Sequence, residues 1–316
     1  MHIPVAGLTE IYDVSAVEKV LAENDDFTNA LLKKMYQKMI RTGGTRYLIR
    51  PSSSAFLTEL YDLCPNFSSV LDNVRRSVEL ALYGEEPVQF TPILLTGAPG
   101  VGKTHFAKLL AKAMGTAYEF VPMSSMTAGF ILSGSAATWQ NARHGKVAHA
   151  LVEGAFANPL LVLDELDKAG GDSRHDSLAS LYQLMEGDTA AHFKDEFLDV
   201  EIDASHVLWV STANYPERIP EPILQRMEVI EVPSPTREQA VHIANHIYAG
   251  LLCEHKWKFD AELDSTALDE VADVAPREMR KALLSAMGEA RMKGRDRVRG
   301  EDFPKQANNG KRRIGF

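Results

Sequence analysis

Cysteine is scarce in this chain, which has only Cys64 and Cys253 among 316 residues. Two cysteines so far apart provide neither a disulfide framework nor the ligand spacing of a zinc site, and this usage is typical of a reducing cytoplasm. No apolar run approaches the ~18 residues that a membrane-spanning helix needs. The first ten residues lack the charged and apolar segments of a signal peptide. We therefore expect a soluble, cytoplasmic protein without a membrane partner.

Positive charge is also in deficit, since 34 Lys and Arg residues face 43 Asp and Glu residues, for a formal net charge of −9. Phosphate backbones and anionic membranes attract positive surfaces, so an acidic chain is a poor default binder of either. Residues 291–316 are an exception, because basic residues outnumber acidic ones there. We interpret them as a solvated surface and a disordered tail, with contact to nucleic acid or an acidic partner as the alternative.

The apolar pattern changes along the chain. Residues 15–41 and 67–83 have apolar side chains at helical spacing, and the turn-rich stretch 42–54 reads as a linker. Further along, short apolar runs alternate with helical patterns, which predicts a parallel sheet covered on both faces. The runs are 92–97, 118–123, 160–165, 206–212 and 228–232. After the turn at 233–236 only helical patterns follow, at 238–249, 265–274 and 276–291.

Residues 97–104 match the phosphate-binding pattern G-x-x-x-x-G-K-T, between an apolar strand and a helix. Glycines let the backbone wrap around phosphate, and the helix N-terminus favours an anion. We expect Lys103 to reach the β- and γ-phosphates of ATP and the Thr104 hydroxyl to bind Mg²⁺. A chance glycine-rich turn is the alternative. The expected nucleotide-binding residues are Gly97, Ala98, Pro99, Gly100, Val101, Gly102, Lys103, Thr104 and Asp164.

Two carboxylates follow the apolar strand at 160–163, and parallel sheets place ligands at this end of their strands. We expect Asp164 to hold Mg²⁺, directly or through water, and Glu165 to polarise the attacking water as general base. A core strand that ends in solvated acids is the alternative. Asn214 follows the strand at 206–212 and could orient the same water, although an Asn there is also an ordinary turn residue.

The phosphate loop, the Asp-Glu strand and the strand-ending Asn, in this order, resemble an AAA+ ATPase. Residues 160–232 resemble the ATPase module of the Lon proteases almost throughout, and the resemblance extends from about residue 65 to about residue 305. It implies a P-loop α/β domain of three layers with a parallel sheet, followed by a small all-α lid domain. The expected boundaries are 1–60 for an N-terminal helical segment and linker of unknown role, 61–233 for the α/β core, 234–305 for the lid, and 306–316 for a disordered basic tail.

The resemblance also implies roles for two arginines. Arg226 stands where the family has its arginine finger, which would reach the nucleotide of a neighbouring subunit. Arg277 resembles the second-sensor arginine of the lid, near the start of a helix that Pro276 begins, with Arg280 as the rival candidate. Surface or structural arginines are the alternatives. Asn66 and Phe67 fall at the position where the family places residues behind the adenine ring. The sequence has no clear family signature at this position.

Residues 133–147 resemble the family's first pore loop, in which an aromatic and then an apolar residue grip an extended polypeptide. Trp139 keeps the aromatic residue, whereas Gln140 and Asn141 depart from the pattern and put processive threading in doubt. A core tryptophan is the alternative interpretation.

Two other groups of residues could suggest a catalytic or a metal site, but we predict neither. The serines at 52–54 lack a lysine partner for peptidase chemistry. His242 and His246 have a zinc-compatible spacing but no third ligand.

Lon proteases continue into a Ser/Lys peptidase domain, and this sequence stops at Phe316, so we expect no intrinsic protease. The leading hypothesis is a ring-forming, hexameric ATPase that uses ATP and Mg²⁺ to remodel or unfold a protein client. A nucleic-acid-directed AAA+ ATPase, such as a loader or transposition regulator, is one alternative, although 133–147 offers only Arg143 and Lys146 as basic residues. The other alternative is a scaffold that assembles with ATP but barely hydrolyses it.

Overall fold

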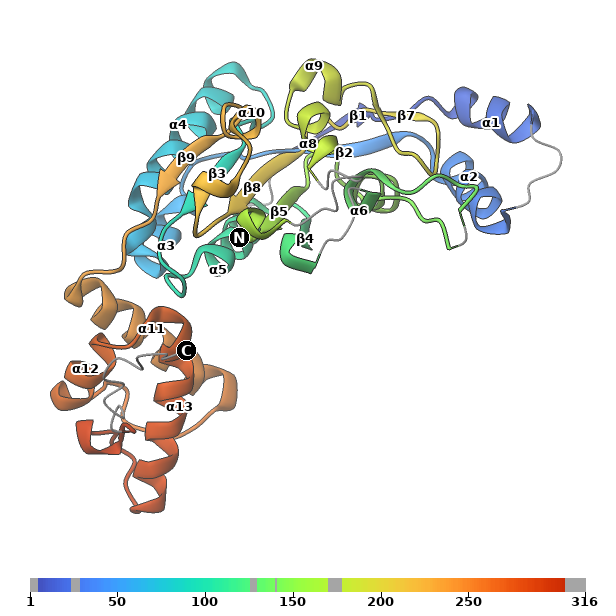
Figure 1. Cartoon of the computed structure of the whole chain (residues 1–316). Helices are drawn as coiled ribbons and strands as arrows, with labels where there is room; N and C mark the ends of the chain where they lie inside the picture. The colour runs from blue at the N-terminus through green and yellow to red at the C-terminus, as the bar shows by residue number, and fades with distance from the viewer. Residues whose placement is uncertain (1–4, 24–28, 126–129, 140, 170–177, 305–316) are drawn as a thin grey trace, which may run out of the picture. The chain divides into compact units, whose positions relative to one another are not determined.

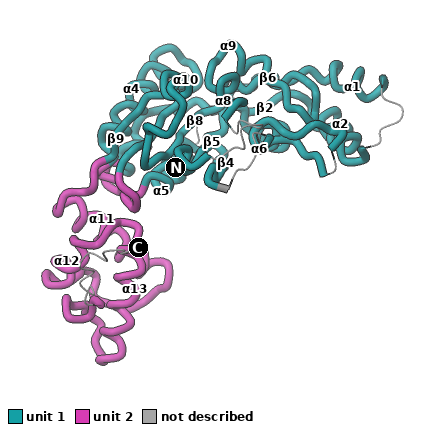
Figure 2. Tube along the Cα trace, in the orientation of Figure 1, with its two compact units in different colours: residues 1–60, 67–97, 103–232 teal, residues 61–66, 98–102, 233–316 magenta. Residues whose placement is uncertain are grey.

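The computed structural model describes residues 5–23, 29–125, 130–139, 141–169 and 178–304 (Figure 1). The chain divides into two compact units, coloured separately in Figure 2. Unit 1 contains residues 1–60, 67–97 and 103–232, and unit 2 contains residues 61–66, 98–102 and 233–316. None of the described helices combines the length and the apolar composition of a bilayer-spanning segment.

A five-stranded parallel sheet forms the centre of unit 1, in the order β4-β5-β8-β3-β9. All five predicted strands are confirmed, and β3, β5 and β8 are buried along almost their whole length, as strands covered on both faces must be. Helix α5 (Lys103–Met114) packs against β4, β5 and β8. The strands are β3 (Ile93–Thr96), β4 (Tyr118–Pro122), β5 (Leu160–Asp164), β8 (Leu208–Thr212) and β9 (Glu228–Glu231).

Most of the shorter elements before residue 233 belong to unit 1, although residues 61–66 belong to unit 2. The predicted helix at 67–83 is confirmed as α4 (Ser68–Gly84), and α3 (Phe56–Leu63) precedes it. A short hairpin pairs β6 (Phe193–Lys194) with β7 (Glu201–Ile202). The remaining short helices are α6 (Phe130–Ser133), α7 (Lys146–Ala148), α8 (Ala179–Leu184), α9 (Gly187–Ala190), α10 (Glu221–Leu224), the π-helix η3 (His149–Glu153) and the 3₁₀ turns η1 (Pro65–Phe67), η2 (Met123–Ser125), η4 (Leu166–Lys168) and η5 (Pro216–Arg218).

The N-terminal segment differs from its predicted structure. The expectation of a linker at 42–54 is wrong, because Thr45–Arg50 forms strand β2, antiparallel to β1 (Val5–Glu10). The single helix expected at 15–41 is described as two, α1 (Val14–Glu23) and α2 (Ala30–Thr42). Asn29 begins α2, because its side chain accepts hydrogen bonds from the backbone N–H groups of the first turn.

Glycine and a buried charge explain why β2 was missed. A Cβ at Gly44 would lie 1.9 Å from the carbonyl oxygen of Tyr12. Glycine is therefore needed here because two backbone segments pass close to each other, whereas the sequence suggested a linker. Arg46 is only 3% exposed, and its guanidinium donates to the carbonyl oxygens of Leu151 (2.8 Å) and Val152 (2.7 Å). Side chains of α1 and α2, including Val17 and Met39, are part of the main core of unit 1.

Unit 2 has the three predicted helices: α11 (Arg237–His255), α12 (Ser265–Ala272) and α13 (Pro276–Met292). Thr236 and Gln239 form a capping box at the start of α11, and Pro276 occupies the first turn of α13. Apolar side chains from all three helices form a separate core, which includes Tyr248, Leu251, Val271, Leu283 and Met287.

Several basic residues after α13 have acidic partners in unit 2. The fully buried carboxylate of Asp302, in the 3₁₀ turn η6 (Gly300–Asp302), receives Nζ of Lys293 and Nη2 of Arg295, both at 2.7 Å. The backbone N–H of Arg299 also donates to it, at 3.0 Å. Burial acts to raise the pKa of Asp302, but the hydrogen bonds from Arg295 and Lys293 outweigh burial and lower the pKa to about 2.

Replacing Asp302 with Asn should lower the free energy of unfolding of unit 2 by about 2 kcal/mol at pH 7. A carboxyl whose pKa falls from 3.8 to about 2 on folding contributes its full stability above pH 3.8 and loses it as the pH falls towards 2. Urea unfolding at pH 7 and near pH 2 measures both values. The difference between the parent protein and the variant should shrink at the lower pH.

Asp269→Asn is the matched control, because its ion pair with Arg237 (2.7 Å) joins side chains that are 56% and 73% exposed. Such a pair contributes roughly 0–1 kcal/mol. Equal losses in the two variants, or a loss for Asp302→Asn that does not change with pH, would contradict the prediction.

Candidate nucleotide-binding site

The loop between β3 and α5 has a backbone that only glycine adopts readily. Gly97, Gly100 and Gly102 have φ of 133°, 86° and 105°, in the left-handed region. A Cβ on Gly97 would lie 2.4 Å from the carbonyl oxygen of Val232, so this residue also needs glycine for space. Helix α5 begins at Lys103, and the first N–H groups of a helix lack partners within the helix. The loop therefore ends on backbone donors that suit an anion.

Lys103 is 8% exposed, and its ammonium group donates hydrogen bonds to oxygen atoms of two distant segments. Its Nζ donates to the carbonyl oxygen of Gly97 at 2.7 Å and to Oδ1 of Asn214 at 2.9 Å. Burial lowers the pKa of Lys103, and nearby carboxylates, of which Asp167 acts most strongly, oppose that shift. The structure thus brings together a residue of the phosphate loop and the Asn that follows β8.

Thr104 and Asp164, both predicted to bind Mg²⁺, are in direct contact. Oγ1 of Thr104 donates to Oδ1 of Asp164 at 2.5 Å, and Oγ1 of Thr212 donates to the same oxygen at 2.9 Å. Thr212 was not predicted, although its place at the end of β8, paired with Leu95 of β3, puts it at the same sheet edge. Hydroxyl and carboxylate oxygens are the ligands that Mg²⁺ prefers.

Glu165 follows β5 with a left-handed backbone, at φ 57° and ψ 51°. A non-glycine residue in this region is uncommon and often marks a functional position. Its backbone N–H donates to Oγ1 of Thr212 at 2.9 Å, and its Oε1 pairs with Nζ of Lys168 at 2.5 Å. The hydrogen bond to Glu165 raises the pKa of Lys168. Lys168 was also missed from the sequence, because a Lys three residues after a Glu is common on any surface.

Asp167 is a further acidic residue at this edge and is 7% exposed. Its Oδ2 accepts a hydrogen bond from the backbone of Tyr215 at 3.1 Å, whereas its buried Oδ1 has no hydrogen-bond partner among the described residues. Buried polar atoms are normally paired. This orphaned oxygen, together with the oxygens of Asp164 and Thr104, gives the site a set of donors that fits a hydrated divalent cation.

Arg226 lies in the turn between α10 and β9, where its contacts are with other residues. Its Nη2 is 2.9 Å from Oε2 of Glu186, its Nη1 donates to the carbonyl oxygen of Pro222 at 2.7 Å, and its guanidinium lies 5.8 Å from the Tyr182 ring centroid. The side chain is 30% exposed. Within one chain, Arg226 is therefore held by Glu186 at the surface of unit 1.

The two rival lid arginines have different surroundings within unit 2. The backbone N–H of Arg277 donates to the carbonyl oxygen of Gly100 at 3.2 Å, which ties the start of α13 to the phosphate loop. Arg280 instead pairs with Glu254 at 2.8 Å. Asn66 is buried, and its amide donates to the carbonyl oxygens of Val101 (3.4 Å) and Pro233 (3.2 Å).

Trp139 is 51% exposed and makes an edge contact with Phe130, with ring centroids 6.0 Å apart. The alternative of a core tryptophan is therefore wrong. Gln140, its predicted partner in the pore loop, lies outside the described residues.

The sheet order, the glycine loop and the acidic strand end define an AAA-type ATPase fold. Residues 93–234 match the family described as "ATPase family associated with various cellular activities (AAA)". Among characterised proteins, the Lon protease of Halothermothrix orenii is 37% identical over 178 residues, which is 56% of this chain and 23% of that protease. The chain thus resembles the ATPase module of Lon proteases and spans less than a quarter of that relative's length.

Two solved structures share the fold. Thermotoga maritima RuvB, in its P216G mutant, aligns with a TM-score of 0.53 and 16% identity over 80% of this chain and 71% of its own. Hsp104 in a closed state, with ATPγS and FITC casein, aligns with a TM-score of 0.58 and 16% identity over 77% of this chain and 48% of its own. These identities are low, so the likeness concerns the fold alone.

Proposed function

We propose that this chain binds ATP with Mg²⁺ and hydrolyses it, as the motor module of a ring-forming AAA+ ATPase that remodels or unfolds a protein client. The observation that carries the proposal is the meeting of Lys103, Thr104, Asp164 and Glu165 at the carboxyl ends of β3, β5 and β8. Such edges are where α/β sheets place their ligands.

Lys103 is the residue to which we assign the β- and γ-phosphates. The Gly97 carbonyl and the Asn214 amide, to which it donates, are neutral, and phosphate oxygens would form stronger, charge-assisted hydrogen bonds with it. The loop from Gly97 to Gly102 would surround the phosphates with backbone N–H groups. Thr104 and Asp164 would hold Mg²⁺, which when bound neutralises charge that develops on the phosphates.

Glu165 is the proposed general base, and Asn214 is proposed to orient the water that Glu165 activates. In the structure Oε1 of Glu165 is paired with Lys168, an ion pair that favours the charged form of the carboxylate and so weakens it as a base while the pair lasts. The left-handed backbone of Glu165 fixes the direction in which the side chain leaves β5.

Assembly would complete the site. Arg226 lies at the surface of unit 1 in a salt bridge with Glu186, an exposed pair of the kind that contributes little to stability. We propose that Arg226 leaves Glu186 to contact the nucleotide of a neighbouring subunit in a ring, a hexamer by analogy with the family. Arg277, which is tied to the phosphate loop through its backbone, is the proposed sensor within unit 2.

A protein client is favoured over nucleic acid by charge and by Trp139. The chain carries a net charge of −9, and an exposed tryptophan suits the grip on an extended polypeptide. We also propose that no peptidase site lies at residues 52–54, because Oγ of Ser54 donates to Oε1 of Glu79 at 2.6 Å. A Ser/Lys peptidase needs a lysine there.

Glu165→Gln should bind ATP with near-parent affinity and slow its hydrolysis by about 100-fold or more, because the amide cannot accept the proton. Lys103→Ala should instead lose ATP binding, since it removes the charge that holds the phosphates. Calorimetric ATP titration and phosphate release measure the two effects. Glu196→Gln, which changes an exposed carboxylate elsewhere in unit 1, is the control. Unchanged turnover in Glu165→Gln would reject the assignment of the base.

Arg226→Ala should bind ATP but hydrolyse it at least ~10-fold more slowly, and mixing it with Glu165→Gln should restore part of the turnover. In a mixed ring, an intact Glu165 in one subunit can meet an intact Arg226 from the next. Arg75→Ala, which also breaks an exposed Arg–Glu pair in unit 1, should retain turnover without mixing. If mixing restored nothing while sedimentation showed mixed assemblies, Arg226 would not act between subunits.

An unfolded protein should raise the ATPase rate severalfold, and duplex DNA should leave it unchanged, because phosphate is repelled by an acidic surface. Trp139→Ala should remove most of this stimulation, whereas Trp257→Ala, which also removes a half-exposed tryptophan, should not. Steady-state phosphate release with each additive is the measurement. Stimulation by DNA alone would support the nucleic-acid-directed alternative.

A further inference from the structure

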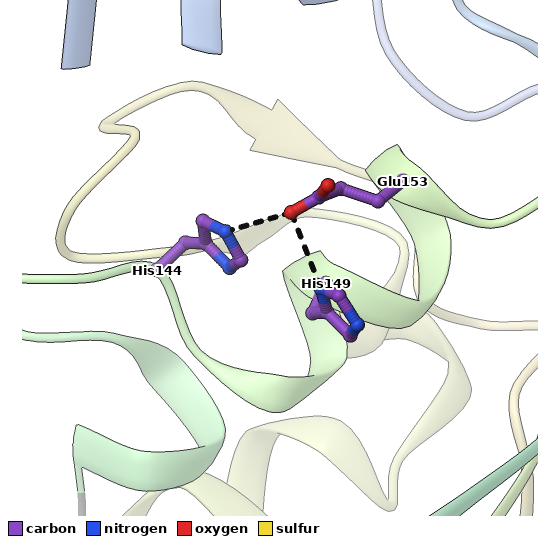
Figure 3. A group of neighbouring side chains, drawn as sticks. All are labelled: His144, His149 and Glu153. Atoms are coloured by element: carbon purple, nitrogen blue, oxygen red, sulfur yellow. Dashed lines mark hydrogen bonds and ion pairs between the residues drawn. The ribbon is translucent and has the colours of Figure 1, made fainter. Parts of the chain in front are cut away.

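Two histidines and a glutamate of unit 1 form a cluster that the proposed nucleotide site does not use (Figure 3). His144 precedes α7, and His149 and Glu153 are the first and last residues of η3. Nε2 of His144 lies 3.0 Å from Oε1 of Glu153, and Nδ1 of His149 lies 3.2 Å from the same oxygen. One ligand-type atom from each residue lies within 4.8 Å of the others.

These separations suit a small metal ion. Zinc binds His nitrogens and Glu oxygens at about 2.0–2.2 Å, and in a tetrahedral site such ligands lie roughly 3.4 Å apart. The two distances to Oε1 of Glu153 are slightly shorter than this value. Small side-chain rotations that move the ligand atoms apart by a few tenths of an ångström would make space for the ion.

The surroundings of His144 favour a cation between the rings and the carboxylate. Nδ1 of His144 is 3.3 Å from the carbonyl oxygen of Gly145, to which it can donate a hydrogen bond. A neutral ring that donates from Nδ1 presents the lone pair of Nε2 to Oε1 of Glu153, so that two acceptors face each other. Either a second proton on the ring or a metal ion removes this conflict. An imidazole N–H bonded to a backbone carbonyl is also the usual support of a metal-binding histidine.

The carboxylate of Glu153 is oriented from its other side. Nζ of Lys38, in α2, lies 2.5 Å from Oε2, which leaves Oε1 turned towards the two histidines. Burial acts to raise the pKa of Glu153, but hydrogen bonds from Lys38 and His149 lower it overall, so the carboxylate is ionised at neutral pH.

The backbone that holds the cluster is fixed by buried charges. The carboxylate of Asp195, which is 0% exposed, accepts the N–H of Gly145 at 2.7 Å. Carbonyl oxygens within the π-helix are held by Arg46, as described above. π-helical turns are rare, cost regular hydrogen bonding and are frequently found at functional sites. Here the turn places His149 and Glu153 on one side, facing His144.

We propose that His144, His149 and Glu153 form a binding site for a divalent transition metal of the zinc class, through Nε2, Nδ1 and Oε1, with a fourth position open. Two imidazoles and one carboxylate suit Zn²⁺, Co²⁺ or Ni²⁺, whereas Mg²⁺ and Ca²⁺ prefer oxygen ligands alone. His149 is 45% exposed, which provides a path for entry. The bound ion would join the end of the 133–147 stretch to η3, and the site does not depend on the proposed ATPase function.

The test uses the full chain without an affinity tag, in a His242→Ala/His246→Ala background. Those two histidines lie on α11 with their Nε2 atoms 3.1 Å apart and could bind metal themselves. Titration with Zn²⁺, and with Co²⁺ followed by its visible absorption, should give one equivalent of tight binding and the spectrum of a four-coordinate ion. His144→Ala, His149→Ala and Glu153→Gln should each weaken binding by about 100-fold or more.

His192→Ala is the matched control, because His192 also pairs with a glutamate in unit 1, at 3.2 Å, but has no second histidine in that pair. It should leave binding unchanged. Circular dichroism checks that each variant folds, and zinc should raise the melting temperature of the parent background but not that of the three variants. Crystals with Zn²⁺ should show its anomalous signal among the three residues. The proposal is overturned if the parent background binds no equivalent of Zn²⁺ or Co²⁺, or if the three variants bind as the control does.

Discussion

Parallel pairing of β3, β5 and β8 aligns the ends of three strands, and the proposed ATPase site depends on that alignment. Leu163 pairs with Ser211, and Leu95 pairs with Thr212, so the next residues of each strand emerge at one edge. Asp164 and Thr212 meet there, with Thr104 from the helix that follows β3. Because β3, β5 and β8 are buried along almost their whole length, their pairing cannot slip by one residue without disturbing the packing of their apolar side chains. The burial of the sheet therefore also fixes the distances between the groups that would do chemistry.

Buried charged side chains also hold distant segments of the chain in fixed positions. Lys103, Arg46, Asp195 and Asp302 are each less than 10% exposed and each has several hydrogen-bond partners. An unpaired charge at such depth would cost several kcal/mol, so each of these groups holds its partners in one arrangement. Lys103 links the phosphate loop to the end of β8, Asp302 closes the end of unit 2, and Arg46 and Asp195 support the backbone around His144 and His149.

The two candidate cation sites of unit 1 differ in ligand chemistry. Thr104 and Asp164 offer only oxygen atoms, beside a loop that suits a phosphate, which matches a hard ion that retains water. His144, His149 and Glu153 offer two nitrogens and one oxygen, which matches a borderline ion bound by the protein itself. The sites therefore need not compete, and the Mg²⁺ and Zn²⁺ dependence of the protein can be separated by variants in one site at a time.

Local patterns in the sequence were sufficient for the strands of the sheet, the glycine loop and the three helices of unit 2. Each depends on residues within a few positions of one another, through apolar periodicity or backbone freedom. Contacts between distant segments were not predictable in this way. The pairing of 5–10 with 45–50 was missed because β2 directly follows a glycine turn and contains a buried arginine, which donates to carbonyl oxygens about a hundred residues later. The same reason hid Thr212 and the approach of Lys38 to Glu153. Short-range chemistry thus determined which elements form, and only the packing of distant segments decided which side chains meet, because such contacts depend on the three-dimensional path of the whole chain.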